Sequence, residues 1–150
     1  MRWAAIAGLA AWLAASAAAA DLTGTWMGLM PGRGRRPPQD VAFRLVQEGE
    51  SLRGKLYGEG LSSPIVEGKV SEGGDVWFVV ETREQAGNQI NDVRYEFDGV
   101  LCQGGIELTR ERASARDAVS GVAIPVRRPD DTDQEDRGRR FVSFRLEPLF

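Results

Sequence analysis

The sequence predicts an all-β protein, specifically an eight-stranded antiparallel up-and-down barrel preceded by a signal peptide. Three observations support this prediction: short segments in which apolar and polar residues alternate, turn-forming residues between them, and no apolar stripe of 3.6-residue period beyond residue 20. A flat meander of eight strands would leave two unpaired edges, and closure into a barrel removes them. A β-sandwich, which would bury both faces of its strands, is the alternative.

The first twenty residues have the pattern of a secretory signal peptide. Arg2 gives a positive start, residues 4–15 are apolar and rich in Ala and Leu, and residues 16–20 are small. The apolar run is shorter than the roughly 20 residues that a membrane-spanning helix needs. We therefore expect cleavage after Ala20, an exported (periplasmic or secreted) protein without a stable membrane anchor, and a single β-barrel domain over residues 21–150.

The alternating segments follow one another along the mature chain. The first contains the only Gly-X-Trp of the sequence, and Gly54, Gly58, Gly68 and Gly99 fall on inward-facing positions, where small residues let strands coil tightly. The expected strands are residues 21–30, 41–47, 52–58, 64–70, 76–82, 90–101, 106–110 and 140–146.

One segment, residues 111–139, is charged and irregular, and we expect it to be a polar surface insertion before the last strand. A short extra strand within residues 119–126 is compatible with the pattern, although Pro125 restricts it to an edge. The acidic residues of this insertion lack the spacing of a calcium-binding loop, so we expect no metal site.

The composition argues against most catalytic and nucleic-acid-binding functions. The chain has no histidine, one cysteine (Cys102) and a formal net charge of −3. These counts exclude histidine-based triads and a Cys–His nucleophile, and an acidic domain is a poor partner for phosphates. Glu48, Glu81 and Glu84 lie at predicted turns or strand ends, so a carboxylate-dependent hydrolase is the least favoured hypothesis. We expect no enzyme activity and no cofactor.

A family resemblance rests on LTGTW at residues 22–26, the spaced residues Phe43, Leu45, Gln47 and Gly49 with the Leu and Gly that follow, and IVEGKVSEGGDVWFVV at residues 65–80. With these motifs the chain resembles small secreted bacterial β-domains of uncharacterised function, similar in pattern to the lipocalin and avidin (calycin) barrels. The resemblance implies that Gly24, Trp26 and Arg145 close one barrel end, with the guanidinium beneath the indole. Biotin binding is not implied, because no matching set of polar residues follows LTGTW.

The predicted interior favours a non-catalytic binding function. An eight-stranded barrel has room for its own side chains or for one small ligand, and the inward positions here are mostly bulky and apolar. We therefore expect a largely filled barrel, with a small apolar ligand held in the mouth opposite Trp26. The residues expected to contact this ligand are Tyr57, Tyr95 and Phe97.

The alternative is a protein-interaction or self-association module that uses the outer wall, with another exported protein as partner. If Arg145 points inward, its neighbours on the last strand point outward, beside the outer face of the first strand. An exposed apolar stripe of this kind would mark a contact surface. Its residues would be Met27, Leu29, Trp77, Val79, Val142 and Phe144.

Overall fold

The computed structural model describes residues 21–32, 35, 37–58, 61–125 and 141–149, and in this part of the chain all regular structure is β-strand. The strands are β1 (Gly24–Met30), β2 (Gln39–Glu48), β3 (Ser51–Gly58), β4 (Leu61–Val70), β5 (Asp75–Ala86), β6 (Gln89–Cys102), β7 (Gly105–Asp117), β8 (Ala123–Ile124) and β9 (Phe141–Leu149).

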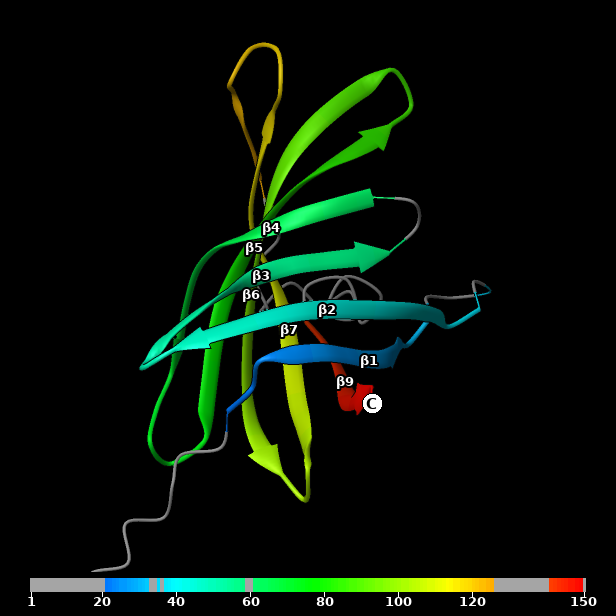
Figure 1. Ribbon diagram of the computed structural model, residues 1–150. Coiled ribbons are helices and arrows are strands. Elements are labelled where there is room, and N and C mark those ends of the chain that lie inside the picture. The colour runs from blue at the N-terminus through cyan, green and yellow to red at the C-terminus, as the bar shows by residue number, and fades with distance from the viewer. Residues whose placement is uncertain (1–20, 33–34, 36, 59–60, 126–140, 150) are drawn as a thin grey trace, which may run out of the picture.

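Eight of these strands close into one antiparallel barrel (Figure 1). Strands β1 to β7 each pair with the next strand along the chain, and β9 completes the circle by pairing with both β7 and β1. The short strand β8 lies outside the circle and pairs only with Ala115 and Arg116 of β7. The predicted up-and-down barrel is therefore confirmed, and closure removes the two edges that a flat sheet would leave.

Strands β5 and β7 run furthest beyond the bounds that the sequence pattern indicated. β7 extends to Asp117, so the first residues of the predicted insertion are strand, and β5 extends to Ala86 through residues expected to form a loop. Both extensions pair with β6, and in Figure 1 the β5–β6 and β7–β8 hairpins project beyond the barrel. Charged side chains are compatible with these extensions, because each of them is at least partly exposed there. Residues 126–139 of the insertion and the predicted signal peptide lie outside the described residues.

The last strand has the opposite orientation to the one expected. Phe144 and Leu146 are buried in the core, and they pair across β7 with Leu108 and Ile106, which face the same interior. Arg145 therefore points outward. The predicted placement of Arg145 beneath Trp26, with Phe144 on the outer wall, is wrong.

Arg145 instead holds the β6–β7 turn from the outside of the barrel. Its Nη1 lies 2.7 Å from Glu107 Oε1, its Nε pairs with Glu147, and its Nη2 donates a hydrogen bond to the Cys102 carbonyl at 2.9 Å. Pairs of this kind at an exposed surface are screened by water and contribute little to stability. The Arg145 side chain thus serves to position the turn rather than to close the interior.

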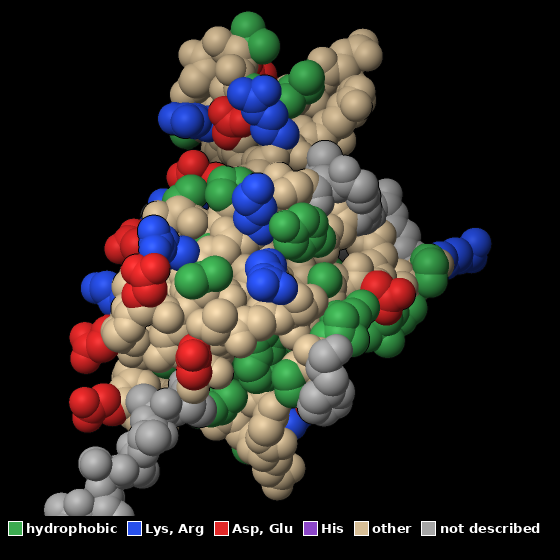
Figure 2. All heavy atoms as spheres, in the orientation of Figure 1, with side chains coloured by type: hydrophobic (Ala, Val, Ile, Leu, Met, Phe, Trp, Pro, Cys, Tyr) green, Lys and Arg blue, Asp and Glu red, His purple; other side chains and the backbone are tan. Residues whose placement is uncertain are grey.

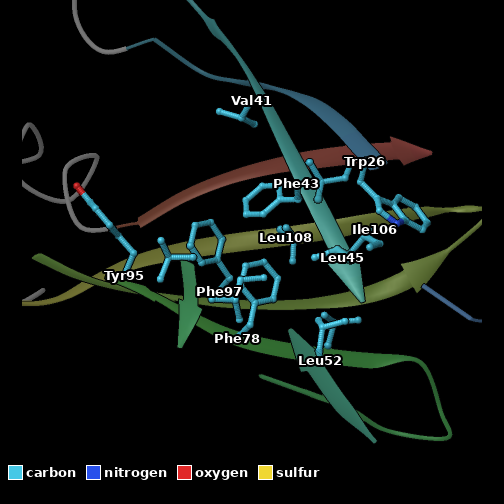
Figure 3. Packing of buried hydrophobic residues seen from close by; sticks show 14 of the residues in the cluster. Trp26, Val41, Phe43, Leu45, Leu52, Phe78, Tyr95, Phe97, Ile106 and Leu108 are labelled. Carbon is cyan, nitrogen blue, oxygen red and sulfur yellow. The ribbon is translucent and has the colours of Figure 1, made fainter. Parts of the chain in front are cut away.

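The interior is filled along most of its length (Figure 3). Trp26 lies at one end and donates a hydrogen bond from Nε1 to the Leu22 carbonyl at 2.8 Å. In the middle, the rings of Phe43, Phe78 and Phe97 are fully buried and lie 4.7 to 5.5 Å apart by centroid. The polar side chains of the mouth cluster described below lie at the other end of the interior, beyond Phe97.

Candidate binding site at the barrel mouth

The interior becomes polar at the end opposite Trp26. Glu84 of β5, Tyr95 of β6 and Arg110 and Arg112 of β7 lie there, and Figure 3 shows Tyr95 on the far side of the phenylalanine cluster from Trp26. Alternation along the strands places them inward. Arg110 and Arg112 continue the inward series begun by Ile106 and Leu108, and they pair with Phe97 and Tyr95 of β6. We call these four residues the mouth cluster.

Glu84 is bound through both of its carboxylate oxygens. The Tyr95 hydroxyl donates a short hydrogen bond to Oε1, and Arg112 Nη1 lies 3.1 Å from Oε2. The Glu84 carboxylate therefore accepts a hydrogen bond from the Tyr95 phenol and forms an ion pair with the Arg112 guanidinium. The Glu84–Arg112 pair also cancels one positive charge against one negative charge.

Arg110 has no such partner. Its guanidinium lies over the Tyr95 ring, 4.5 Å from the centroid, and its Nη1 donates to the Met30 sulfur at 3.2 Å, although a thioether is only a weak acceptor. Its Nε is buried without a hydrogen-bond partner, and none of the described residues offers it a carboxylate. Within the described part of the chain, the mouth cluster therefore carries one positive charge that no carboxylate offsets.

The environment of Tyr95 raises its pKa to about 12, chiefly because burial disfavours the phenolate and secondly because Glu84 accepts the hydroxyl proton. Arg110 and Arg112 oppose this shift without overcoming it. The phenol therefore stays protonated at ordinary pH and serves as a hydrogen-bond donor. The mouth cluster thus combines a carboxylate bound by Tyr95 and Arg112 with a guanidinium that has no carboxylate partner among the described residues.

We predict that the Tyr95 phenol ionises near pH 12 in the folded protein. The chain has two tyrosines, so in Tyr57→Phe the absorbance change near 295 nm reports Tyr95 alone. Because the pKa in the folded state lies above the unfolded value of about 10, the stability that this group contributes is complete below pH ~10 and is lost as pH rises towards 12. Adding Glu84→Gln lowers the midpoint, whereas Glu81→Gln, on the outer wall, leaves it unchanged. A midpoint near 10 in the folded Tyr57→Phe protein would contradict the burial of Tyr95.

The structure brings only one of the three predicted ligand contacts into the mouth cluster. Tyr95 belongs to it. Phe97 is fully buried beneath it, and Tyr57 is 44% exposed on the outer wall. The strand alternation itself places Leu56, and not Tyr57, on the inward face of β3. Gly24 opens β1 with a φ of +144°, a conformation that favours glycine.

The six residues of the predicted outer stripe do not share one surface. Met27 and Leu29 are exposed, at 39% and 55%, and Figure 2 shows hydrophobic side chains gathered over β1, with Lys and Arg side chains over β2 and β3. Trp77 is half-buried on the outer wall, whereas Val79 is fully buried. Val142 packs against the core, and Phe144 is part of the core.

The three carboxylates considered for hydrolysis do not face one cleft. Glu48 pairs with Arg53 at 2.6 Å at the end of β2, Glu81 pairs with Arg94 at 3.6 Å on the outer wall, and Glu84 points into the mouth. The described residues contain no group of three or more potential metal ligands. No helix among them is long and apolar enough to cross a membrane.

Sequence reasoning missed Glu84, Arg110 and Arg112 as mouth residues. For the two arginines the signal was present, because Arg110 falls in register with Ile106 and Leu108. Glu84 was hidden because the glycine and asparagine that follow it suggested an earlier end to β5. Its contact with Tyr95 joins residues eleven positions apart and follows from the β5–β6 pairing.

Comparison with known proteins gives no further guide to the site: no protein-family model, curated protein or solved structure matches the chain.

Proposed function

We propose that the protein is an exported, non-catalytic binding protein that holds a small, largely apolar molecule with an anionic group at the barrel mouth. What carries the proposal is Arg110. It is an inward-facing guanidinium with a buried, unpartnered Nε and no carboxylate partner among the described residues. A charge held in such surroundings is unfavourable unless something pairs with it, and an anionic ligand group would do so.

The surroundings of Arg110 favour an anion over a cation. Glu84, the carboxylate of the mouth cluster, is already occupied by Tyr95 and Arg112, so it has no free charge for a cationic ligand. The apolar part of the ligand would lie against Val41 of the core and the partly buried Leu56 and Val142 that pack against it. The filled interior below, with Phe97 fully buried, limits the ligand to the mouth.

The calycin resemblance belongs to the same proposal. The closed barrel of eight antiparallel strands is consistent with a calycin-like fold, in which a ligand at one open end is a reasonable expectation. The outward position of Arg145 departs from the motif that suggested the resemblance. The binding hypothesis therefore depends on Arg110 and not on that motif.

We predict that the protein distinguishes ligands by their head group. Calorimetry with three probes that share a twelve-carbon chain, namely dodecanoate, dodecanol and dodecyltrimethylammonium, isolates the charge. A hydrogen bond to a charged group contributes about 1.5–3 kcal/mol, so dodecanoate should bind roughly 10- to 100-fold more tightly than dodecanol. In Arg110→Met this preference should disappear.

The matched control is Arg53→Met, which removes an exposed arginine that is paired with Glu48 and leaves the preference unchanged. Arg110→Met should fold, because methionine retains the apolar stem and removes an uncompensated charge. Equal affinities for dodecanoate and dodecanol in the unmodified protein would refute the proposal. A preference that survives Arg110→Met would refute the role of Arg110.

A further inference from the structure

A second candidate site lies on the outer wall, away from the mouth cluster. It is a groove of about 660 Å³ across the outer faces of β4, β5, β6, β7 and β9. Five of its lining residues, Lys69, Trp77, Asp98, Thr109 and Ser143, give it its chemical character. We call these five residues the Trp77 row.

Strand register places the Trp77 row in one line. Lys69 pairs with Trp77, Trp77 with Asp98, Asp98 with Thr109, and Thr109 with Ser143. The line crosses five neighbouring strands, and strands lie about 4.8 Å apart, so it is roughly 19 Å long. The flanking residues of these strands face the interior, so the five side chains of the row share the outer wall.

Most polar groups of this row lack a partner among the described residues. Within the described part of the chain, the Lys69 ammonium, the Trp77 indole N–H and the Asp98 carboxylate make no side-chain hydrogen bond or ion pair. The hydroxyls of Thr109 and Ser143 lie 3.1 Å apart and share one hydrogen bond, which leaves each with further capacity. The row therefore presents donors and acceptors on either side of a half-buried indole.

The charges of the groove favour a neutral ligand. The carboxylates of Asp75 and Asp98, with Glu107 that pairs with Arg145, outnumber the single ammonium of Lys69, which disfavours phosphates and other anions. Lys69 stands directly beside Trp77 in the register, so a cationic ligand over the indole would meet a like charge. Hydroxyl groups, which both donate and accept hydrogen bonds, match carboxylate, ammonium and hydroxyl partners at once.

We propose that this groove binds a neutral oligosaccharide, with a sugar ring against the Trp77 indole and its hydroxyls bonded to Asp98, Lys69 and the Thr109–Ser143 pair. An indole offers a large flat apolar face with a polar edge, which suits a ring that has one C–H face and a rim of hydroxyls. A concave site with one aromatic surface and a few placed polar groups is the usual form of a small-ligand site. This site is independent of Arg110 and of the mouth.

The test is titration of the purified protein with cellotetraose, maltotetraose and chitotetraose, followed by calorimetry and tryptophan fluorescence. After residue 20 the chain has two tryptophans, and Trp26 is buried at the barrel end, so a fluorescence change reports Trp77. We expect at least one of these sugars to bind with a Kd of about 1 mM or below. Trp77→Ala should weaken binding at least tenfold, and Asp98→Asn should weaken it several-fold.

Two controls separate the groove from other surfaces and from misfolding. Tyr57→Ala removes an exposed aromatic side chain from β3, outside the groove, and should leave sugar binding unchanged. Trp77→Phe keeps an aromatic face and should retain part of the affinity, with an unchanged unfolding temperature. Arg110→Met should not affect sugar binding, which distinguishes this site from the mouth.

Three results would overturn the proposal. The first is the absence of heat and fluorescence change with all three sugars at concentrations well above the expected Kd. The second is sugar binding that survives Trp77→Ala. The third is binding of tetramethylammonium in place of the sugars, lost in Trp77→Ala, which would make the groove a cation site.

Discussion

Replacing Phe97 by alanine should remove a large part of the folding free energy of the protein. The Phe97 ring is fully buried, stacks on Phe78 at 4.7 Å, and meets Phe43 and Phe144 edge-on at 5.5 and 6.4 Å. Deleting a buried phenylalanine costs about 3–5 kcal/mol, because apolar contact is lost and a cavity remains. Domains of this size unfold with about 5–15 kcal/mol, so the variant would be marginally stable.

Urea unfolding followed by circular dichroism measures this loss as a lower midpoint at unchanged slope. Tyr57→Ala is the matched control, since it removes an exposed aromatic side chain from the same barrel and should change stability by about 0.5 kcal/mol or less. Phe97→Leu should fall between the two, because leucine fills part of the space. A midpoint for Phe97→Ala equal to that of Tyr57→Ala would mean that the barrel interior is not packed around these rings.

The barrel itself could be predicted from sequence because its signals are local. Alternation of apolar and polar residues identifies each strand, and the short turns between strands fix an antiparallel meander. The ends of β5 and β7 were less predictable. There β5 and β7 continue to pair with β6, and the charged side chains that suggested loops are at least partly exposed.

The predicted orientation of β9 was wrong because a motif was given more weight than the alternation of apolar and polar residues. Val142, Phe144 and Leu146 alternate with Ser143 and Arg145, which by period two alone places the apolar residues inside. The resemblance to barrels with an inward arginine led to the opposite prediction, with Arg145 inside and the apolar residues outside. Apolar burial decides the orientation, because turning the strand over would expose Phe144 and Leu146 and bury the Arg145 charge.

The mouth cluster was predictable only in part, for a related reason. Tyr95 and Arg110 fall on inward positions that alternation identifies. Their partners Glu84 and Met30 come from other strands, and neither contact follows from spacing along one strand. The Trp77 row likewise needs the register of five strands before its residues are seen to lie in one line.

Replacing Gly54 by alanine should destabilise the barrel although it adds only one methyl group. Gly54 has a φ of +145°, which side chains rarely adopt, and a Cβ there would lie 1.8 Å from the Arg44 carbonyl oxygen of the paired strand. Because that atom is backbone, β2 and β3 would have to separate where Leu45 pairs with Gly54. We expect a loss of about 3 kcal/mol or more, seen as a fall in unfolding temperature of roughly 10 °C.

Gly58 provides the matched control for Gly54, because it lies on the same strand and the same face. A Cβ at Gly58 would meet only the Val41 Cγ1 at 3.8 Å and the Asp40 oxygen at 4.0 Å, which are ordinary contacts. Gly58→Ala should therefore be neutral, or stabilise by up to about 1 kcal/mol by restricting the unfolded chain. Equal melting temperatures for the two variants would show that β2 and β3 do not approach as closely at Gly54 as this register requires. A selective loss in Gly54→Ala would show that glycine at this position permits the close pairing on which barrel closure depends.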